Sequence, residues 1–93
     1  MSGLSQDSIL RLAPGCRLNA AGGPDDLVLI PEGALRLKGP ARMIVELCDG
    51  ERTLSGIVDE LRRRYPAEDA TRIQKETEAL LAQLRERGVL EQI

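Results

Sequence analysis

The sequence predicts an α+β fold in which a small antiparallel sheet precedes three helices. Two observations lead to this prediction. Between residues 16 and 38, two short runs that alternate between apolar and polar residues and one apolar run are separated by glycine and proline turns, which is typical of strands. From residue 41 onward, apolar residues recur every three or four positions, which indicates helices. With 93 residues, the chain is long enough for one domain with one modest core.

Three short strands are predicted in the first part of the chain. Residues 16–20 alternate in polarity, residues 27–30 are a short apolar run, and the two flank a turn rich in glycine, proline and aspartate. Residues 31–33 make a second reversal before the strand 34–38. Side chains alternate along a strand, so the two leucines of this third strand point inward and its two basic residues point outward.

Capping and helix-breaking residues mark the ends of three predicted helices, which we expect to pack as a three-helix bundle against the sheet. In chain order, these residues are Pro40 and Gly50, Thr53 and Pro66, and Asp69 and Gly88. Proline suits the first helical position, threonine and aspartate cap helix starts, and glycine adopts the left-handed conformation that ends helices. Residues 89–93 are predicted to be a tail that packs back on the core.

The N-terminal residues 1–14 are predicted to be a flexible arm, with a short helical turn near residues 8–12, because they show no clean period. Residues 15–93 then form a single domain. The arm lacks the basic start and apolar run of a signal peptide, and no apolar run approaches the roughly 18 residues of a membrane helix. We therefore expect a cytoplasmic protein that does not bind membranes.

The composition argues against nucleic-acid binding and catalysis. The chain carries 13 basic and 15 acidic residues, so no long-range field attracts it to phosphate backbones. Tyr65 is its one aromatic residue, which leaves nothing else to stack bases on. The chain has no histidine, the commonest general base and metal ligand, and its acidic residues occupy surface or capping positions. We predict no catalytic residue, no metal and no cofactor.

The cysteines and a run of arginines each allow two interpretations. Cys16 and Cys48 are either small core residues in a reducing compartment or a disulfide, since the sequence does not give their separation. Residues 62–64 are three arginines at the end of the second helix, where they either contact phosphate or stabilise the helix dipole.

The segments 49–53 and 34–38 also allow two interpretations each. Residues 49–53 are either a recognition loop or the structural stop and start of two helices. The strand 34–38 is either an edge protected by its charges or an edge kept free for a guest strand, which would pair with its backbone.

Three strings of residues carry a family resemblance. They are Val28-Leu-Ile-Pro-Glu-Gly33 with Leu35-x-Leu37, Ile44-Val-Glu-Leu-Cys-Asp-Gly-Glu-Arg-Thr53, and Ile57-Val-Asp-Glu-Leu61. These strings resemble the pyrroloquinoline quinone (PQQ) biosynthesis protein D family, and the likeness runs from about residue 14 to residue 91. The string from Leu47 to Thr53 is fairly specific to that family. One departure is Gly39-Pro40, where the family often has Asn or Ser before the helix.

The resemblance implies a non-enzymatic peptide chaperone of winged-helix-like fold, the type called a RiPP recognition element in pathways that modify ribosomally made peptides. Members bind the leader of the PQQ precursor peptide and present it to a radical S-adenosylmethionine (radical SAM) enzyme that cross-links its Glu and Tyr side chains. By this resemblance, the leader adds as a strand beside residues 34–38 and lies against the third helix. The peptide-binding residues implied are Leu35, Arg36, Leu37, Lys38, Arg72, Ile73, Glu76, Thr77 and Leu80.

Two other function classes remain alternatives to peptide binding. A winged-helix DNA-binding regulator is suggested by the three-helix order and the arginines at 62–64, although the chain lacks a basic surplus. A small enzyme without cofactor has no nucleophile–base pair to support it. The long hairpin on a small core also admits a homodimer formed by strand exchange.

Overall fold

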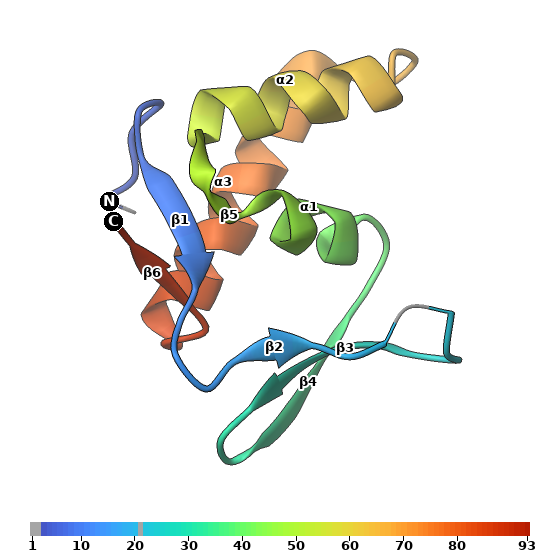
Figure 1. The fold of residues 1–93 in the computed structure, drawn as a ribbon. Coiled ribbons are helices and arrows are strands. Elements are labelled where there is room, and N and C mark those ends of the chain that lie inside the picture. The colour runs from blue at the N-terminus through green and yellow to red at the C-terminus, as the bar shows by residue number, and fades with distance from the viewer. Residues whose placement is uncertain (1–2, 21) are drawn as a thin grey trace.

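The computed structural model describes residues 3–20 and 22–93, and this part of the chain contains three helices and two three-stranded antiparallel sheets (Figure 1). The elements in chain order are β1 (Ile9–Leu12), β2 (Arg17–Leu18), β3 (Asp26–Ile30), β4 (Gly33–Leu37), α1 (Ala41–Leu47), β5 (Asp49–Thr53), α2 (Leu54–Arg64), α3 (Ala70–Glu86) and β6 (Leu90–Gln92). One sheet has the strand order β2-β3-β4 and the other β5-β1-β6. A mixed fold of strands and three helices is therefore confirmed.

The sheet β2-β3-β4 contains the three strands predicted for residues 16–38. β3 and β4 form a hairpin whose register pairs Ile30 with Gly33 and Val28 with Leu35. Val28 is fully buried and Leu37 is nearly so, while Arg36 and Lys38 are exposed, as the alternation predicted. The hairpin therefore has one face on the core, and its second strand lies at the edge of the sheet.

The second sheet, β5-β1-β6, was not predicted. The helical turn expected near residues 8–12 is wrong, because Ile9–Leu12 is a strand that pairs with both β5 and β6. Residues 49–53 also form a strand rather than only a helix stop and start. The tail does pack back on the core, where Val89 and Leu90 are 1% exposed, and it forms β6. The winged-helix likeness and the three-helix bundle stay predictions.

Backbone hydrogen bonds tie the N-terminal segment to the rest of the domain. Carbonyls of Gln6 and Ser8 accept from the first residues of α2, at 3.0 and 2.8 Å, and the Ala13 N–H donates to the Val89 carbonyl at 2.9 Å. Leu10, between these bonds, is 1% exposed. The arm predicted for residues 1–14 thus contains a strand that belongs to the core.

The predicted capping residues act at two of the three helices. The Thr53 hydroxyl accepts from the Gly56 N–H at 3.1 Å at the start of α2, and the Asp69 carboxylate accepts from the first N–H groups of α3. Pro40 occupies the N-cap of α1 rather than its first helical position and offers no side-chain cap. Gly50 has the left-handed φ of +81° that its glycine allows, but it lies inside β5, where the ladder to β1 is irregular.

The core lies between the two sheets and the helices and consists of aliphatic side chains. Its largest fully buried members are Leu10, Val28, Val45, Leu54, Ile57, Leu81, Val89 and Leu90. One half-buried arginine joins α1 to the hairpin side of this core: Arg42 donates to the Asn19 side chain and to the Asn19 carbonyl, both at 2.6 Å. Its guanidinium also lies 3.5 Å from the Asp26 carboxylate. Within the described residues, no helix is both long and apolar enough to cross a membrane.

The two cysteines have different surroundings, and both are free thiols in the structure. Burial, with the neighbouring Asp49 carboxylate, raises the pKa of the Cys48 thiol to about 12. The Cys48 thiol therefore stays protonated at pH 8. Since the thiolate is the nucleophile, we expect iodoacetamide to alkylate half-buried Cys16 and leave Cys48 unmodified in the native protein.

Mass spectrometry of the tryptic peptides checks this expectation, with a sample unfolded in urea as the control in which both thiols react. Alkylation of Cys48 at the same rate as Cys16 in the native protein would contradict it.

Candidate functional site

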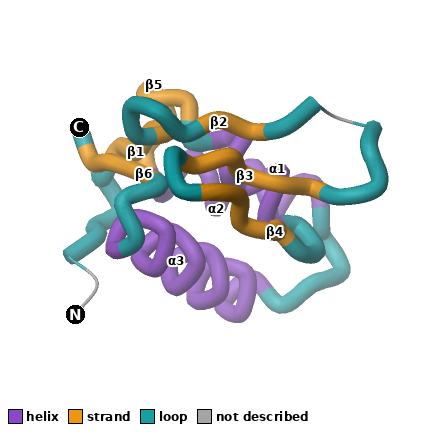
Figure 2. The backbone as a smooth tube through the Cα atoms, turned by 90° about the horizontal axis from the view of Figure 1, so that it is seen from below, coloured by secondary structure: helices purple, strands orange, loops and turns teal. Residues whose placement is uncertain are grey.

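β4 is the edge strand of its sheet that lies nearest α3 (Figure 2). Within the described residues, no other strand pairs with this edge, since β4 pairs only with β3. The strand 34–38 was predicted as an edge, and the structure confirms that position with the bounds Gly33–Leu37. Arg36 and Lys38 are exposed there, which fits either a protected edge or an edge left free for a guest.

The backbone bonds of Leu27 establish which groups of β4 face the free edge. The Leu27 N–H donates to the Asn19 side chain and the Leu27 carbonyl accepts from the Asn19 N–H, both at 3.0 Å. Leu27 is paired with Arg36, so this pair exchanges no hydrogen bonds. The N–H and carbonyl of Arg36 therefore point away from β3, and those of Ala34, two residues earlier, point the same way.

A groove of about 310 Å³ lies between β4 and α3. The residues that line it from the strand side are Leu35, Arg36, Leu37, Lys38 and Ala41, and those from α3 are Leu80, Gln83, Leu84 and Arg87. Its floor is apolar, because Leu37, Ala41 and Leu84 are buried core residues. The strand and helix predicted to hold a peptide thus border one common groove.

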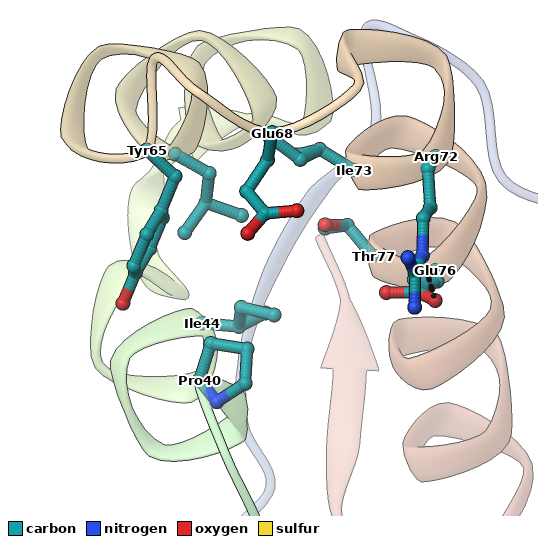
Figure 3. Close-up of a pocket in the computed structure, with 9 residues that line it drawn as sticks. Pro40, Ile44, Tyr65, Glu68, Arg72, Ile73, Glu76 and Thr77 are labelled. Atoms are coloured by element: carbon teal, nitrogen blue, oxygen red, sulfur yellow. Dashed lines mark hydrogen bonds and ion pairs between the residues drawn. The ribbon is translucent and has the colours of Figure 1, made fainter.

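A second pocket, of about 290 Å³, lies further toward the start of α3 (Figure 3). Its lining comes from three helices and their ends, and consists of Pro40, Ile44, Leu61, Tyr65, Glu68, Arg72, Ile73, Glu76 and Thr77. The pocket and the groove are adjacent, since Pro40 lines one and Ala41 the other, and Thr77 and Leu80 are one helical turn apart on α3.

The nine predicted site residues divide between these two hollows. The strand residues and Leu80 line the groove, whereas Arg72, Ile73, Glu76 and Thr77 line the pocket. The prediction omitted the end of the groove next to the C-terminus of α3, which is formed by Gln83, Leu84 and Arg87. Ile73, Thr77, Leu80 and Leu84 recur at four, three and four positions in the sequence, and extending the predicted wall along this stripe would have included Leu84. It also omitted the wall that α1 and α2 contribute to the pocket, which the sequence did not indicate.

The charged side chains at the two hollows are exposed, and three of them form ion pairs. The Arg36 side chain lies 3.8 Å from the Asp25 carboxylate, and Arg72 donates to Glu76 at 3.0 Å. The hydrogen bond and the charge of Glu76 raise the pKa of Arg72 above its ordinary value. Such exposed pairs contribute little to stability, so these side chains can rearrange when a ligand binds.

The arginines at 62–64 have local partners. Arg62 lies 4.0 Å from the Asp59 carboxylate, Arg64 donates to Glu60 at 2.9 Å, and Arg63 also pairs with Glu60. The bond from Arg64 is the main reason that the pKa of Glu60 falls below its ordinary value. These ion pairs offset much of the positive charge on which the DNA-binding alternative depended.

The segment 49–53 is explained by its local structure. The Asp49 carboxylate accepts from the Glu51 and Arg52 N–H groups, both at 2.9 Å, and Arg52 also forms an ion pair with it at 3.0 Å. These backbone bonds hold the pKa of Asp49 below its usual range. In the part of the chain that the structure describes, no group of three or more histidine, cysteine, aspartate or glutamate residues is arranged to hold a metal.

Residues 27–90 match the family model described as coenzyme PQQ synthesis protein D (PqqD). A protein of Methylococcus capsulatus named PqqA binding protein is 34% identical to the chain over 91 residues, which cover 97% of this chain and 95% of that protein. These matches include nearly all of β3 and the whole of β4 and α3, the two elements that border the groove.

Two solved structures resemble the fold. The solution NMR structure of the PqqD part of Methylobacterium extorquens PqqCD, described as a functional, stand-alone RiPP recognition element, has a TM-score of 0.78 and 30% identity, and the match covers 97% of this chain and 96% of that one. The heterocyclase TruD shows the fold alone, with a TM-score of 0.65 and 22% identity over 92% of this chain and 12% of that protein.

Proposed function

Because the chain belongs to the coenzyme PQQ synthesis protein D family, we propose that it binds the precursor peptide in PQQ biosynthesis as a RiPP recognition element. The observation that carries the proposal is the free edge of β4 beside an apolar groove. The role is non-catalytic. The family findings give no support to the DNA-binding alternative.

The peptide leader binds, in this proposal, as a fourth strand next to β4. The outward N–H and carbonyl groups of Ala34 and Arg36 supply the backbone bonds, which need no particular side chain in the guest. Alternate side chains of the guest then enter the groove and contact Leu80 and Leu84 of α3. Main-chain bonding accounts for affinity, and the groove accounts for selection among peptides.

We further propose that the bound peptide is presented to the radical SAM enzyme of the same pathway, as the family resemblance implies. A guest strand at β4 leaves the opposite sheet, β5-β1-β6, free for such a partner. A homodimer formed by strand exchange stays a proposal as well, and it would be tested by light scattering of the protein with and without peptide.

An NMR titration with the PQQ precursor peptide tests the peptide-binding proposal. We expect the amides of residues 34–38 and of one face of α3, from Ile73 to Leu84, to shift, because these border the groove and the pocket. The amides of β5 and β6 serve as the internal control, and their chemical shifts should not change. Shifts confined to β5 and β6 would contradict strand addition at β4.

A further inference from the structure

The pocket next to the groove combines an apolar floor with polar groups at its opening. Ile44 and Leu61 are 5% and 2% exposed and form its base, and the Tyr65 ring stands along one wall (Figure 3). Thr77 is 2% exposed, and its hydroxyl is turned toward the pocket. A volume of about 290 Å³ has room for one large side chain, and the walls fit an aliphatic stem.

The carboxylate of Glu68 forms no ion pair within 4 Å among the described residues, although its charge adds to that of Glu76 in raising the pKa of Arg72. Arg72 is bonded to Glu76 across one turn of α3, at 3.0 Å, on the far side of the pocket. Figure 3 shows the Glu68 carboxylate directed into the opening, where a ligand can reach it. The three charged side chains of the lining carry a net charge of −1, so a cationic partner is favoured over an anionic one.

The pocket continues the groove in which the guest strand lies. Pro40 and Ala41 are consecutive, and the two hollows share the stripe of α3 that includes Thr77 and Leu80. A residue of the guest that lies beyond the end of β4 therefore reaches the pocket without leaving the surface of α3.

Resting on the proposed function, we infer that the pocket takes one lysine or arginine side chain of the bound precursor peptide. The aliphatic stem packs on Ile44, Leu61 and the Tyr65 ring, and the cationic end meets the Glu68 carboxylate. The ring face of Tyr65 adds a favourable contact with a cation. The guest is thus recognised by one charged side chain in addition to its backbone.

Two small probes test the pocket without strand addition. Nα-acetyl-lysine methylamide and Nα-acetyl-norleucine methylamide share a stem and differ in charge. In NMR titrations, we expect the lysine probe to shift the amides of Tyr65, Ile73 and Thr77 with about three-fold higher affinity, the size of one exposed ion pair. Glu68→Gln should abolish that preference, whereas Glu32→Gln, which removes the same charge from the β3–β4 turn, should keep it. High salt should also reduce the preference.

Equal affinity of the two probes, a preference that survives in Glu68→Gln, or an absence of shifts at the pocket would each overturn the inference.

A second experiment uses the precursor peptide, in which each Lys or Arg is replaced by Met in turn. One replacement should lower affinity about three-fold for the native protein and not for Glu68→Gln. If the proposed strand addition is wrong, the precursor peptide does not bind at β4. The lysine probe can still shift the amides of the pocket in that case, so the two failures are distinguishable.

Discussion

Replacing Arg36 by proline is expected to weaken binding of the precursor peptide at least about ten-fold while leaving the fold in place. The Arg36 N–H faces the free edge of β4, so proline removes a donor that β3 does not use and a guest strand needs. Isothermal titration calorimetry measures the affinity, and circular dichroism with urea unfolding verifies the fold.

Two variants serve as controls for the Arg36→Pro experiment. Arg36→Ala keeps the N–H and loses only the exposed ion pair with Asp25, so its affinity should change less than about three-fold. Leu35→Pro removes an N–H that pairs with β3 and should destabilise the hairpin itself. An affinity of Arg36→Pro equal to that of the native protein would rule out strand addition at this edge.

Replacing Leu10 by alanine is expected to lower the free energy of unfolding by about 2 to 4 kcal/mol. Leu10 is 1% exposed in β1, between β5 and β6, and its removal leaves a cavity among fully buried leucines. Such a loss is a large share of the roughly 5 to 15 kcal/mol that stabilises a small domain. Urea unfolding followed by circular dichroism measures it.

Arg11→Ala is the matched control, because Arg11 is the next residue of the same strand and is exposed, with a surface ion pair to Glu91. Its effect should stay below about 1 kcal/mol. If Leu10→Ala were as stable as Arg11→Ala, β1 would not belong to the cooperative core. That result would support the flexible arm predicted from the sequence.

The hairpin and the helix caps could be predicted because their signals are local. The β3–β4 hairpin has an apolar run before a Pro-Glu turn and an alternating run after it, and Thr53 and Asp69 stand directly before amphipathic helices. In these segments, the residues that decide the structure are neighbours in the sequence. Propensity and periodicity therefore suffice to predict their secondary structure.

The sheet β5-β1-β6 could not be predicted in the same way. β1 has four residues, β6 has three, and β5 is the polar string Asp49–Thr53, so none carries a clear alternation. Their pairing joins parts of the chain that are far apart, and a local pattern does not reveal such partners. The burial of Leu10 and Leu90 is a tertiary effect of that pairing.

The sequence led to the part of the candidate site that lies at the edge of β4. The prediction was incomplete at the pocket, where three helices meet. Exposed Arg36 and Lys38 on an alternating strand indicated the edge, and the family resemblance implied α3 as the opposite wall. Tyr65 and Glu68 come from the turn between α2 and α3, whose position depends on helix packing. The sequence alone contains no measure of that packing.

The sheet β5-β1-β6 also has a consequence for how the chain folds. Its bond between Arg11 and Glu91 spans 80 positions, so closing this sheet orders nearly the whole chain at once. The β3–β4 hairpin and the three helices are local and form faster. We therefore expect the β3–β4 hairpin and its edge to form before β6 pairs with β1, so the second sheet closes around a hairpin that already exists.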